Sequence, residues 1–265
     1  MTEHIRNKKG ETFEERFIDI ISDPNNLFIV RDENAGTIVD GSIIMHNGIK
    51  IEKDCYYDDF SKIFVLNKGV HEPSEERMFK MILDDIPEGG TMIELGSYWA
   101  FYSIWFNKTI KNAKNYCIEP DLNNLNTGKR NSLLNDANLD FTQGFIGKNE
   151  VNICNFAKEK NIADIHILHS DIQGFELQML QDAVPLLIAQ KIKYLFISTH
   201  SDSIHYDCID LLKTNNYAII ASADFDTETF CFDGIIVACH KDNTKFGKVD
   251  LGSRSTTKLR STPYF

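Results

Sequence analysis

The chain has 265 residues, of which 42% are hydrophobic and 25% are charged, a composition typical of a globular protein. Its formal net charge of −11 at pH 7 argues against a nucleic-acid partner, because proteins that bind nucleic acids usually carry a basic surface. No apolar run reaches the roughly 18 residues of a membrane span, and residues 1–10 lack the apolar stretch of a secretory signal. We therefore expect a chain without a membrane span that binds a small molecule.

The six cysteines are scattered along the chain, and none forms a C-x-x-C pair. Several stand in apolar stretches, where a free thiol behaves as a small hydrophobic side chain. This pattern favours the reducing cytoplasm and predicts no disulfide framework. The six are Cys55, Cys117, Cys154, Cys208, Cys231 and Cys239.

Residues 1–68 predict an appendage made of one helix and a small antiparallel sheet. Apolar residues recur at helical spacing over Thr12–Ser22, and Pro24 follows where that pattern stops. Short apolar runs come next, with Asp-Gly and Asn-Gly dipeptides of the hairpin type between them. The runs expected to be strands are Leu27–Val30, Thr37–Val39, Ile43–Met45 and Ile49–Ile51.

A further helix is predicted over Pro73–Ile86, because proline favours the first helical turn. Glu75 and Glu76 stand in that turn, where a carboxylate complements the positive end of the helix dipole. We expect these two acids to be surface residues. The alternative is that they close over a bound ligand together with His71 and Glu72.

Residues 69–241 alternate between strands and helices, which predicts a mostly parallel sheet with helices on both faces. The last two strands are joined by a loop without a helix, so the final strand is expected to be antiparallel. A seven-stranded sheet of this kind indicates an α/β, Rossmann-like fold of the class I methyltransferase type and not a dinucleotide dehydrogenase. The expected strands are Thr91–Leu95, Asn115–Ile118, one from Phe141, Ile165–His169, Lys193–Ser198, Tyr217–Ala221 and Gly234–Cys239, and the expected helices are Tyr98–Ile110, Leu122–Leu134, Phe175–Ala189 and Ser203–Thr214.

Residues 242–265 are predicted to be a basic tail. From Lys241 to Phe265 there are six basic residues and two acidic ones, with few aliphatic side chains. Such a segment is expected to be solvated and held to the acidic body by charge. The alternative is a lid over an anionic substrate.

Ligands of doubly wound sheets bind at the carboxyl ends of the strands, so the residues at those ends are the binding candidates. Glu94, Gly96, Ser97 and Tyr98 lie at the end of the first core strand, and Glu119 ends the second. A carboxylate at that second position can accept hydrogen bonds from both ribose hydroxyls of a nucleoside. The alternative is that Gly96 is an ordinary turn residue and Glu119 a surface acid.

The loop after the first core strand discriminates between cofactors. A dinucleotide fold needs G-x-G-x-x-G, so that backbone can approach a pyrophosphate, but here bulky Tyr98 and Trp99 stand where later glycines would be. S-adenosylmethionine (SAM) has no pyrophosphate, and the carboxylate of Glu94 can complement its positive charge. We therefore predict SAM as the cofactor, bound by Glu94, Gly96, Ser97, Tyr98, Glu119, Phe145 and Asp171.

Three segments of the chain together resemble the FkbM-like methyltransferases. Residues 92–103 look like the glycine loop of that family, and residues 117–121, followed by Asn131 and Asn135, look like its ribose-binding segment. Residues 168–180 are similar to its most specific sequence block. The resemblance implies a SAM-dependent methyltransferase that methylates a hydroxyl of a sugar, a polyketide or a related small natural product.

The resemblance covers roughly residues 69–238 and includes departures from the family pattern. The family has Gly-Ala-Asn-Ile-Gly where this chain has Gly-Ser-Tyr-Trp-Ala at residues 96–100. His169 stands in place of a lysine, and Thr199 stands where an acidic residue often precedes the histidine. These changes leave SAM binding expected and put the family's usual acceptor in question.

A hydroxyl acceptor loses a proton during methyl transfer, and a base or a metal ion can assist that loss. The side chains at strand ends that qualify are His169, Asp171, His200 and the nearby His205. We expect Asp171 and His200 to be catalytic, with His200 as the base and Asp171 orienting the acceptor or stabilising the imidazolium. The alternatives are a helix cap for Asp171 and structural roles for the histidines.

A divalent metal bound by Asp171 and His200 is left open, because carboxylate and imidazole are common metal ligands. Two other functions are also left open by the sequence. One is a non-catalytic protein that binds a nucleoside on the same fold. The other is a nicotinamide-dependent oxidoreductase, which the missing glycines disfavour.

Overall fold

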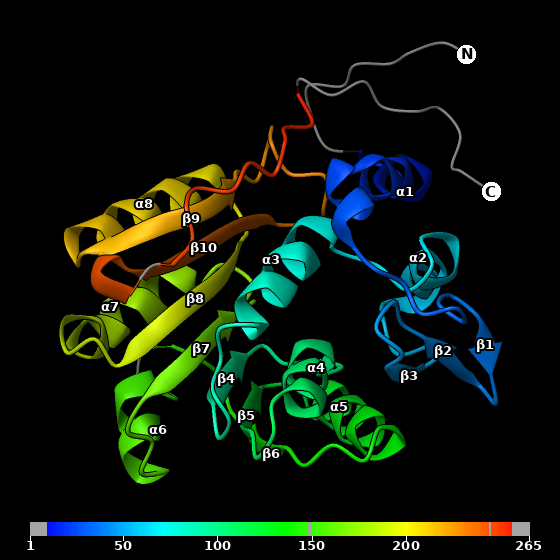
Figure 1. Ribbon diagram of the computed structural model, residues 1–265. Helices are drawn as coiled ribbons and strands as arrows, with labels where there is room; N and C mark the ends of the chain where they lie inside the picture. The colour runs from blue at the N-terminus through cyan, green and yellow to red at the C-terminus, as the bar shows by residue number, and fades with distance from the viewer. Residues whose placement is uncertain (1–9, 148–149, 244, 256–265) are drawn as a thin grey trace.

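The computed structural model describes residues 10–147, 150–243 and 245–255, and its centre is a seven-stranded sheet (Figure 1). The strands are β4 (Thr91–Leu95), β5 (Lys114–Glu119), β6 (Asp140–Gln143), β7 (Ile165–Ser170), β8 (Ile192–Thr199), β9 (Tyr217–Ala223) and β10 (Gly234–His240). Their spatial order is β6-β5-β4-β7-β8-β10-β9. β4 to β8 pair in parallel, whereas β10 is antiparallel to both β8 and β9. The mostly parallel sheet with an antiparallel last strand is therefore confirmed.

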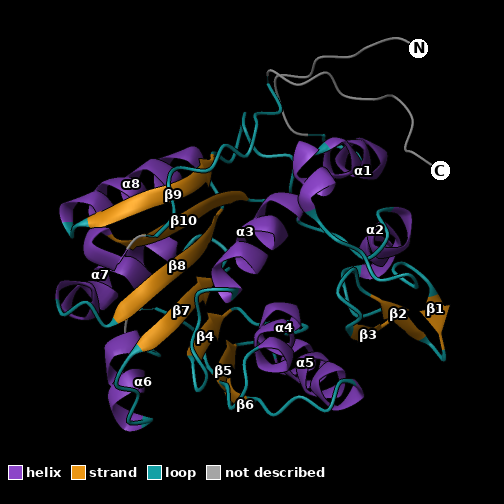
Figure 2. Cartoon of the chain, in the orientation of Figure 1, coloured by secondary structure: helices purple, strands orange, loops and turns teal. Residues whose placement is uncertain are grey.

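Helices cover both faces of this sheet (Figure 2). Successive residues of a strand point to opposite faces, so Met92 packs into the core under one helix layer and Ile93 into the core under the other. α3 (Pro73–Leu83), α4 (Phe101–Thr109) and α5 (Leu122–Leu134) lie on the first face, and α6 (Ile153–Glu159), α7 (Glu176–Ile188) and α8 (Asp202–Thr214) lie on the second. The predicted helices are present, and α6 is an addition that the sequence analysis did not predict.

The N-terminal segment forms a helix and a small antiparallel sheet, as predicted. Its elements are α1 (Phe13–Ser22), the 3-10 helix η1 (Pro24–Phe28), β1 (Ile38–Val39), β2 (Ser42–Ile44), β3 (Lys50–Glu52), the 3-10 helix η2 (Asp58–Ser61) and α2 (Lys62–Leu66). One hydrophobic core joins Phe17, Ile51 and Phe64 of this segment to Phe79 and Phe196 of the central domain. The domain boundary between residues 68 and 69 stays a prediction. The hydrophobic core contains residues from both sides of it.

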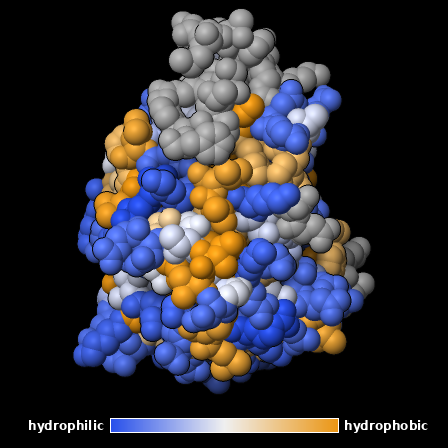
Figure 3. Space-filling view, turned by 90° about the vertical axis from the view of Figure 1, so that its right-hand side faces the viewer, coloured by the Kyte–Doolittle hydropathy of each residue, from blue (hydrophilic) through white to orange (hydrophobic). Residues whose placement is uncertain are grey.

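The run Leu27–Val30 was expected to be a strand, and this expectation is wrong. Asp23 Oδ1 accepts a hydrogen bond from the Asn25 amide (2.7 Å), which starts the 3-10 turn of η1. Leu27 and Val30 are 87% and 89% exposed. Figure 3 views the side of the molecule on which the N-terminal helices and the small sheet lie, and it shows a band of hydrophobic residues among hydrophilic ones.

Two asparagines of α5 hold the small sheet against the central domain. Asn131 Oδ1 accepts from the Glu52 amide (2.9 Å), and its Nδ2 donates to the Trp99 carbonyl (3.0 Å). Asn135 Oδ1 accepts from the Lys50 amide (2.9 Å), and its Nδ2 donates to the carbonyl of the same residue (2.6 Å). The sequence resemblance placed these asparagines in a ribose-binding segment, but the structure pairs them with the backbone of β3.

The described part of the C-terminal segment packs onto the domain. Arg254 is fully buried, and its guanidinium donates to the carbonyls of Asp226 (2.6 Å) and Thr229 (3.0 Å). Leu251 is buried as well, and its carbonyl accepts from Asn25 Nδ2 (2.7 Å). The expectation of a solvated tail is therefore wrong at these positions, whereas the lid alternative stays a prediction, and residues 256–265 lie outside the described residues.

All six cysteines lie in the described part of the chain, and each is a free thiol. Within the same residues, no helix combines the length and the apolar character that crossing a membrane requires.

The variant Asn131→Ala tests the attachment of the small sheet. We expect it to lower the free energy of unfolding by about 1–3 kcal/mol, because it leaves the Glu52 amide and the Trp99 carbonyl without their partner. Urea denaturation measures this change. Asn123→Ala, at an exposed position of the same helix, is the control and should change stability by less than about 0.5 kcal/mol. Equal stability of the two variants would contradict the assignment.

Candidate active site

The turn that follows β4 touches the end of β7 through backbone alone. The Asp171 amide donates to the Leu95 carbonyl (2.9 Å), and the amides of Gly96 and Ser97 both donate to the Ile118 carbonyl (2.9 and 3.1 Å). A Cβ on Gly96 would lie 1.7 Å from the Asp171 carbonyl oxygen, and its φ is +73°. Only glycine therefore allows this turn to approach β7 so closely.

The same turn contains two further residues in the left-handed backbone region, Tyr98 (φ 42°) and Ala100 (φ 61°). For residues with a Cβ this conformation costs roughly 1–2 kcal/mol each, and such strain concentrates at functional sites. These residues delay the start of α4 to Phe101, later than the predicted start at Tyr98. The Tyr98 hydroxyl accepts from the Tyr57 amide (3.1 Å), which anchors the turn to the N-terminal segment.

Glu119 ends β5 and lies beside this turn. Its Oε2 accepts from the Tyr98 amide (3.0 Å), and its Oε1 accepts from the Asp121 amide (2.9 Å). A carboxylate has about four lone-pair positions, and the Asn124 side chain also hydrogen-bonds this carboxylate, so about one position remains for a further donor. The side chain is only 5% exposed, and burial raises its pKa. It borders a cavity of about 150 Å³ at the edge of the sheet.

Two phenylalanines form the apolar part of that cavity. The rings of Phe145 and Phe175 meet edge to face with centroids 4.7 Å apart, and both rings are partly exposed. Ile146 and Ile172 also line this space. An apolar slot beside a carboxylate suits a nucleoside, because the base needs apolar walls and the ribose needs hydrogen-bond acceptors.

A larger cavity of about 300 Å³ adjoins the first, and Gly96, Tyr98 and Asp171 line both. Glu94 lies in its wall, where Oε2 accepts from the Ser103 amide (3.1 Å) and burial raises the pKa of its carboxyl to about 7. Ser97 also lines this cavity, and its buried hydroxyl has no hydrogen-bond partner among the described residues. These groups form a polar end where the amino-acid part of a ligand can bind.

The floor of this cavity is formed by His71, Glu72 and His169, which belong to a buried network of glutamates and histidines. Glu76 bonds both His71 Nδ1 (2.7 Å) and His46 Nε2 (3.0 Å), and Glu75 Oε1 bonds His169 Nε2 (2.5 Å). Glu75 and Glu76 are at most 3% exposed, so the expectation that they are surface residues is wrong. They serve instead as partners of buried histidines.

The carboxylates of this network change the charge of the histidines. Burial by itself would lower the pKa of His71, but Glu72 and Glu76 raise it to about 10. Burial would likewise lower the pKa of His169, but nearby carboxylates, chiefly Glu75, raise it to about 9. These carboxylates therefore favour the cationic form of both rings, which neutralises part of the acidic floor and disfavours either ring as a base.

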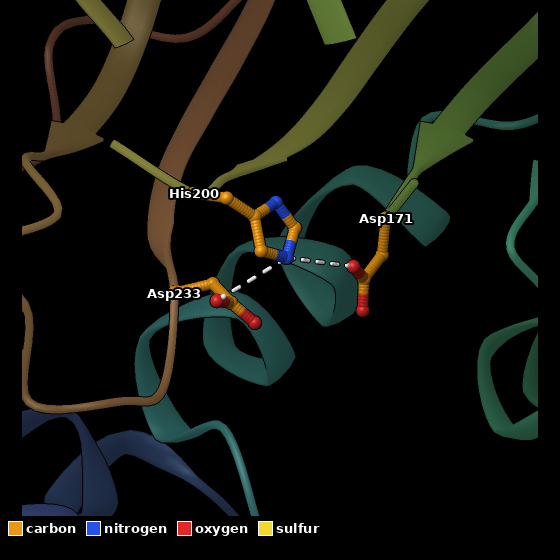
Figure 4. Close-up of side chains that lie close together, drawn as sticks. All are labelled: Asp171, His200 and Asp233. Carbon is orange, nitrogen blue, oxygen red and sulfur yellow. Dashed lines mark ion pairs between the residues drawn. The ribbon is translucent and has the colours of Figure 1, made fainter. Parts of the chain in front are cut away.

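The far wall of the large cavity contains Asp171, His200 and Asp233, which converge as Figure 4 shows. His200 Nε2 lies 3.3 Å from Asp171 Oδ1 and 3.4 Å from Asp233 Oδ1. On the other side of the ring, His200 Nδ1 lies 2.9 Å from Glu176 Oε1. The structure thus brings the two predicted catalytic residues together. Asp171 is not a helix cap, because α7 begins later, with Phe175 as its N-cap.

The carboxylates around His200 determine its protonation. Burial would lower its pKa, but the neighbouring carboxylates of Asp171, Glu176 and Asp233 raise it to about 10. In this state the ring carries a proton on each nitrogen at neutral pH. That proton has to leave Nε2 before His200 can act as a base.

Asp233 was not predicted from the sequence, and the structural alternative holds for His169 and His205. Asp233 precedes β10, and because β10 is antiparallel to β8, its start lies at the edge where the parallel strands end. The predicted antiparallel strand was the signal that could have found it. His205 is held between Thr199 Oγ1 and Ser222 Oγ (2.8 Å each), away from the cavity, and His169 pairs with Glu75.

No family model and no curated protein matches this chain. Solved structures resemble it at low sequence identity. A putative SAM-dependent methyltransferase from Streptococcus mutans aligns with a TM-score of 0.50 and 8% identity over 77% of this chain and 56% of that one. The fold is that of the class I methyltransferases.

Two further structures resemble the chain more weakly. Precorrin-6y C5,15-methyltransferase from Geobacter metallireducens has a TM-score of 0.47 and 12% identity, covering 63% of this chain and 88% of its own. TrmK from M. capricolum, in complex with S-adenosyl-homocysteine (SAH), has a TM-score of 0.42 and 16% identity, covering 64% and 69%.

Gly96→Ala tests the close approach of the two strand ends. The added Cβ meets the Asp171 carbonyl, so we expect a loss of stability above the 1–2 kcal/mol that a positive φ alone costs, together with a loss of SAH binding. Gly89→Ala is the matched control, because Gly89 has φ +76° but open space around its Cβ position. Chemical denaturation and calorimetry measure both effects. A Gly96→Ala protein as stable as Gly89→Ala, with SAH affinity intact, would place the cofactor elsewhere.

Proposed function

We propose that this chain is a SAM-dependent methyltransferase that methylates a hydroxyl of a small acceptor. The observation that carries the proposal is the pair of adjoining cavities along the carboxyl edge of the sheet. A ribose-binding carboxylate, Glu119, lies in one, and the cluster of Asp171 and His200 lies in the other. The glycine turn at Gly96 lies between them and lines both.

The smaller cavity and the turn fit SAM. Glu119 keeps a lone-pair position for a ribose hydroxyl, and Phe145 supplies an apolar wall for the adenine. At the polar end, the unpartnered Ser97 hydroxyl and the Glu94 carboxyl suit the amino-acid part of the cofactor. When bound, SAM supplies an electrophilic methyl group on a positively charged sulfur and leaves as SAH.

The larger cavity takes the amino-acid part of SAM at Glu94 and Ser97, and it fits the acceptor at the wall that contains Asp171 and His200. A volume of about 300 Å³ is at the lower end of the range for small-molecule sites. Asp171 and His200 stand where the turn of Gly96 meets this cavity, so they can hold an acceptor hydroxyl next to the cofactor. Positioning of this kind supplies a large part of the barrier reduction in a displacement reaction. The resemblance to the FkbM-like family supports a hydroxyl of a sugar or a related natural product as the acceptor.

Glu119→Ala tests the cofactor site. We expect SAH affinity to fall by roughly 10- to 100-fold, because each hydrogen bond to a charged group contributes about 1.5–3 kcal/mol. Calorimetric titration with SAH measures the change. Asp140→Ala, an exposed acid at the start of the neighbouring strand β6, is the control and should bind SAH as the wild type does. A folded Glu119→Ala protein with unchanged affinity contradicts the ribose assignment.

His200→Ala tests the acceptor side. We expect turnover of SAM to SAH, with the hydroxylated acceptor that the wild type uses best, to fall by roughly 10²–10⁴. SAH affinity should stay within about threefold, because His200 does not line the smaller cavity, where the nucleoside of SAH is proposed to bind. His166→Ala, near the opposite end of the same sheet, is the control. Near-normal turnover in His200→Ala would remove this residue from the catalytic machinery.

A further inference from the structure

The edge of the larger cavity contains three potential metal ligands on three different segments. Asp171 follows β7, His200 follows β8 and Asp233 precedes β10, and their ligand atoms lie within 4.8 Å of one another (Figure 4). Within the described residues this is the group that combines carboxylate and imidazole atoms at such spacing. We propose that these three side chains form a binding site for one divalent cation.

The two distances from His200 Nε2 to the carboxylate oxygens fit a coordination sphere better than hydrogen bonds, and all three ligand atoms lie within 4.8 Å of one another. His200 Nε2 lies 3.3 and 3.4 Å from the nearest oxygens of Asp171 and Asp233, whereas charge-assisted N–H···O bonds are about 2.7–2.9 Å long. Ligand atoms that bind a common ion at about 2.1 Å stand about 3.0 Å apart in an octahedron and about 3.4 Å apart in a tetrahedron. The Nε2 atom is also buried and has no hydrogen-bond partner among the described residues.

A second carboxylate fixes the histidine in the orientation that a ligand needs. Glu176 is fully buried, and its Oε1 accepts from the Gly174 amide (3.1 Å) and contacts His200 Nδ1 (2.9 Å). A carboxylate that binds one ring nitrogen directs the lone pair of the other toward a metal, an arrangement common around metal-bound histidines. Here that other nitrogen points between Asp171 and Asp233 (Figure 4).

The negative charge of the cluster also favours a bound cation. Three carboxylates surround one imidazole, so a single added proton leaves a net negative charge in a partly buried place. A divalent cation balances two of these carboxylates. Two oxygens and one nitrogen suit Mn²⁺ or a similar first-row ion, and the remaining coordination positions face the cavity, where an acceptor oxygen can bind. This use in methyl transfer rests on the proposed function, whereas the cation site itself does not.

Titration of the full chain with Mn²⁺, followed by electron paramagnetic resonance, tests the site without any acceptor. After treatment with EDTA and its removal, the wild type should bind one Mn²⁺ per chain. Asp233→Ala and His200→Ala should each weaken binding by at least 10-fold, and Glu176→Gln by roughly 10- to 100-fold. The control Asp164→Ala, an exposed acid before β7, should bind as the wild type does.

Two results would overturn the proposal. One is that the wild type binds no Mn²⁺ at millimolar concentration. His200 is then protonated and paired with its carboxylates. The other is binding that Asp233→Ala and His200→Ala retain, which places the ion elsewhere. If one of these proteins does not fold, Asp171→Ala replaces it. A separate SAH titration keeps the proposals apart: Mn²⁺ binding without SAH binding supports the site and contradicts the proposed function.

Discussion

The contact between Gly96 and the end of β7 is the constraint on which the rest of the site depends. Because no Cβ fits between Gly96 and the Asp171 carbonyl, the turn after β4 and the end of β7 approach through backbone alone. This contact places the candidate cofactor turn directly beside the carboxylate of Asp171. The two cavities share this boundary, so any movement of the turn changes both at once.

The buried charges beneath the cavity are the second requirement of the fold. Glu76 bridges two histidines, and Glu75 bonds a third, so the N-terminal end of α3 is tied to the small sheet and to β7. Removal of one partner of a buried ion pair is strongly destabilising, because the other charge stays buried without compensation. The network therefore holds the floor of the larger cavity in one arrangement, and the loss of one partner would leave an uncompensated charge inside the domain.

The sequence predicted the features that follow from strand order and strand ends. Alternating strands and helices indicated the sheet, and the rule that ligands bind at carboxyl ends selected Glu119, Asp171 and His200 in advance. It could not show that Glu75 and Glu76 are buried, since the helix-dipole argument is local and their partners are distant in the chain. Asp233 was not predicted, because it lies at the start of an antiparallel strand, whereas the rule selects the carboxyl ends of parallel strands.

The central claim is that the carboxyl edge of the sheet binds a SAM-type nucleoside and not a dinucleotide. The most direct measurement is the thermal unfolding of the wild-type chain with SAH and, separately, with NAD⁺. At 100 times its Kd a ligand adds about 2.7 kcal/mol of stability, so SAH should raise Tm by roughly 5–10 °C, and NAD⁺ should leave it unchanged. A Tm that rises with NAD⁺ and not with SAH would contradict the account.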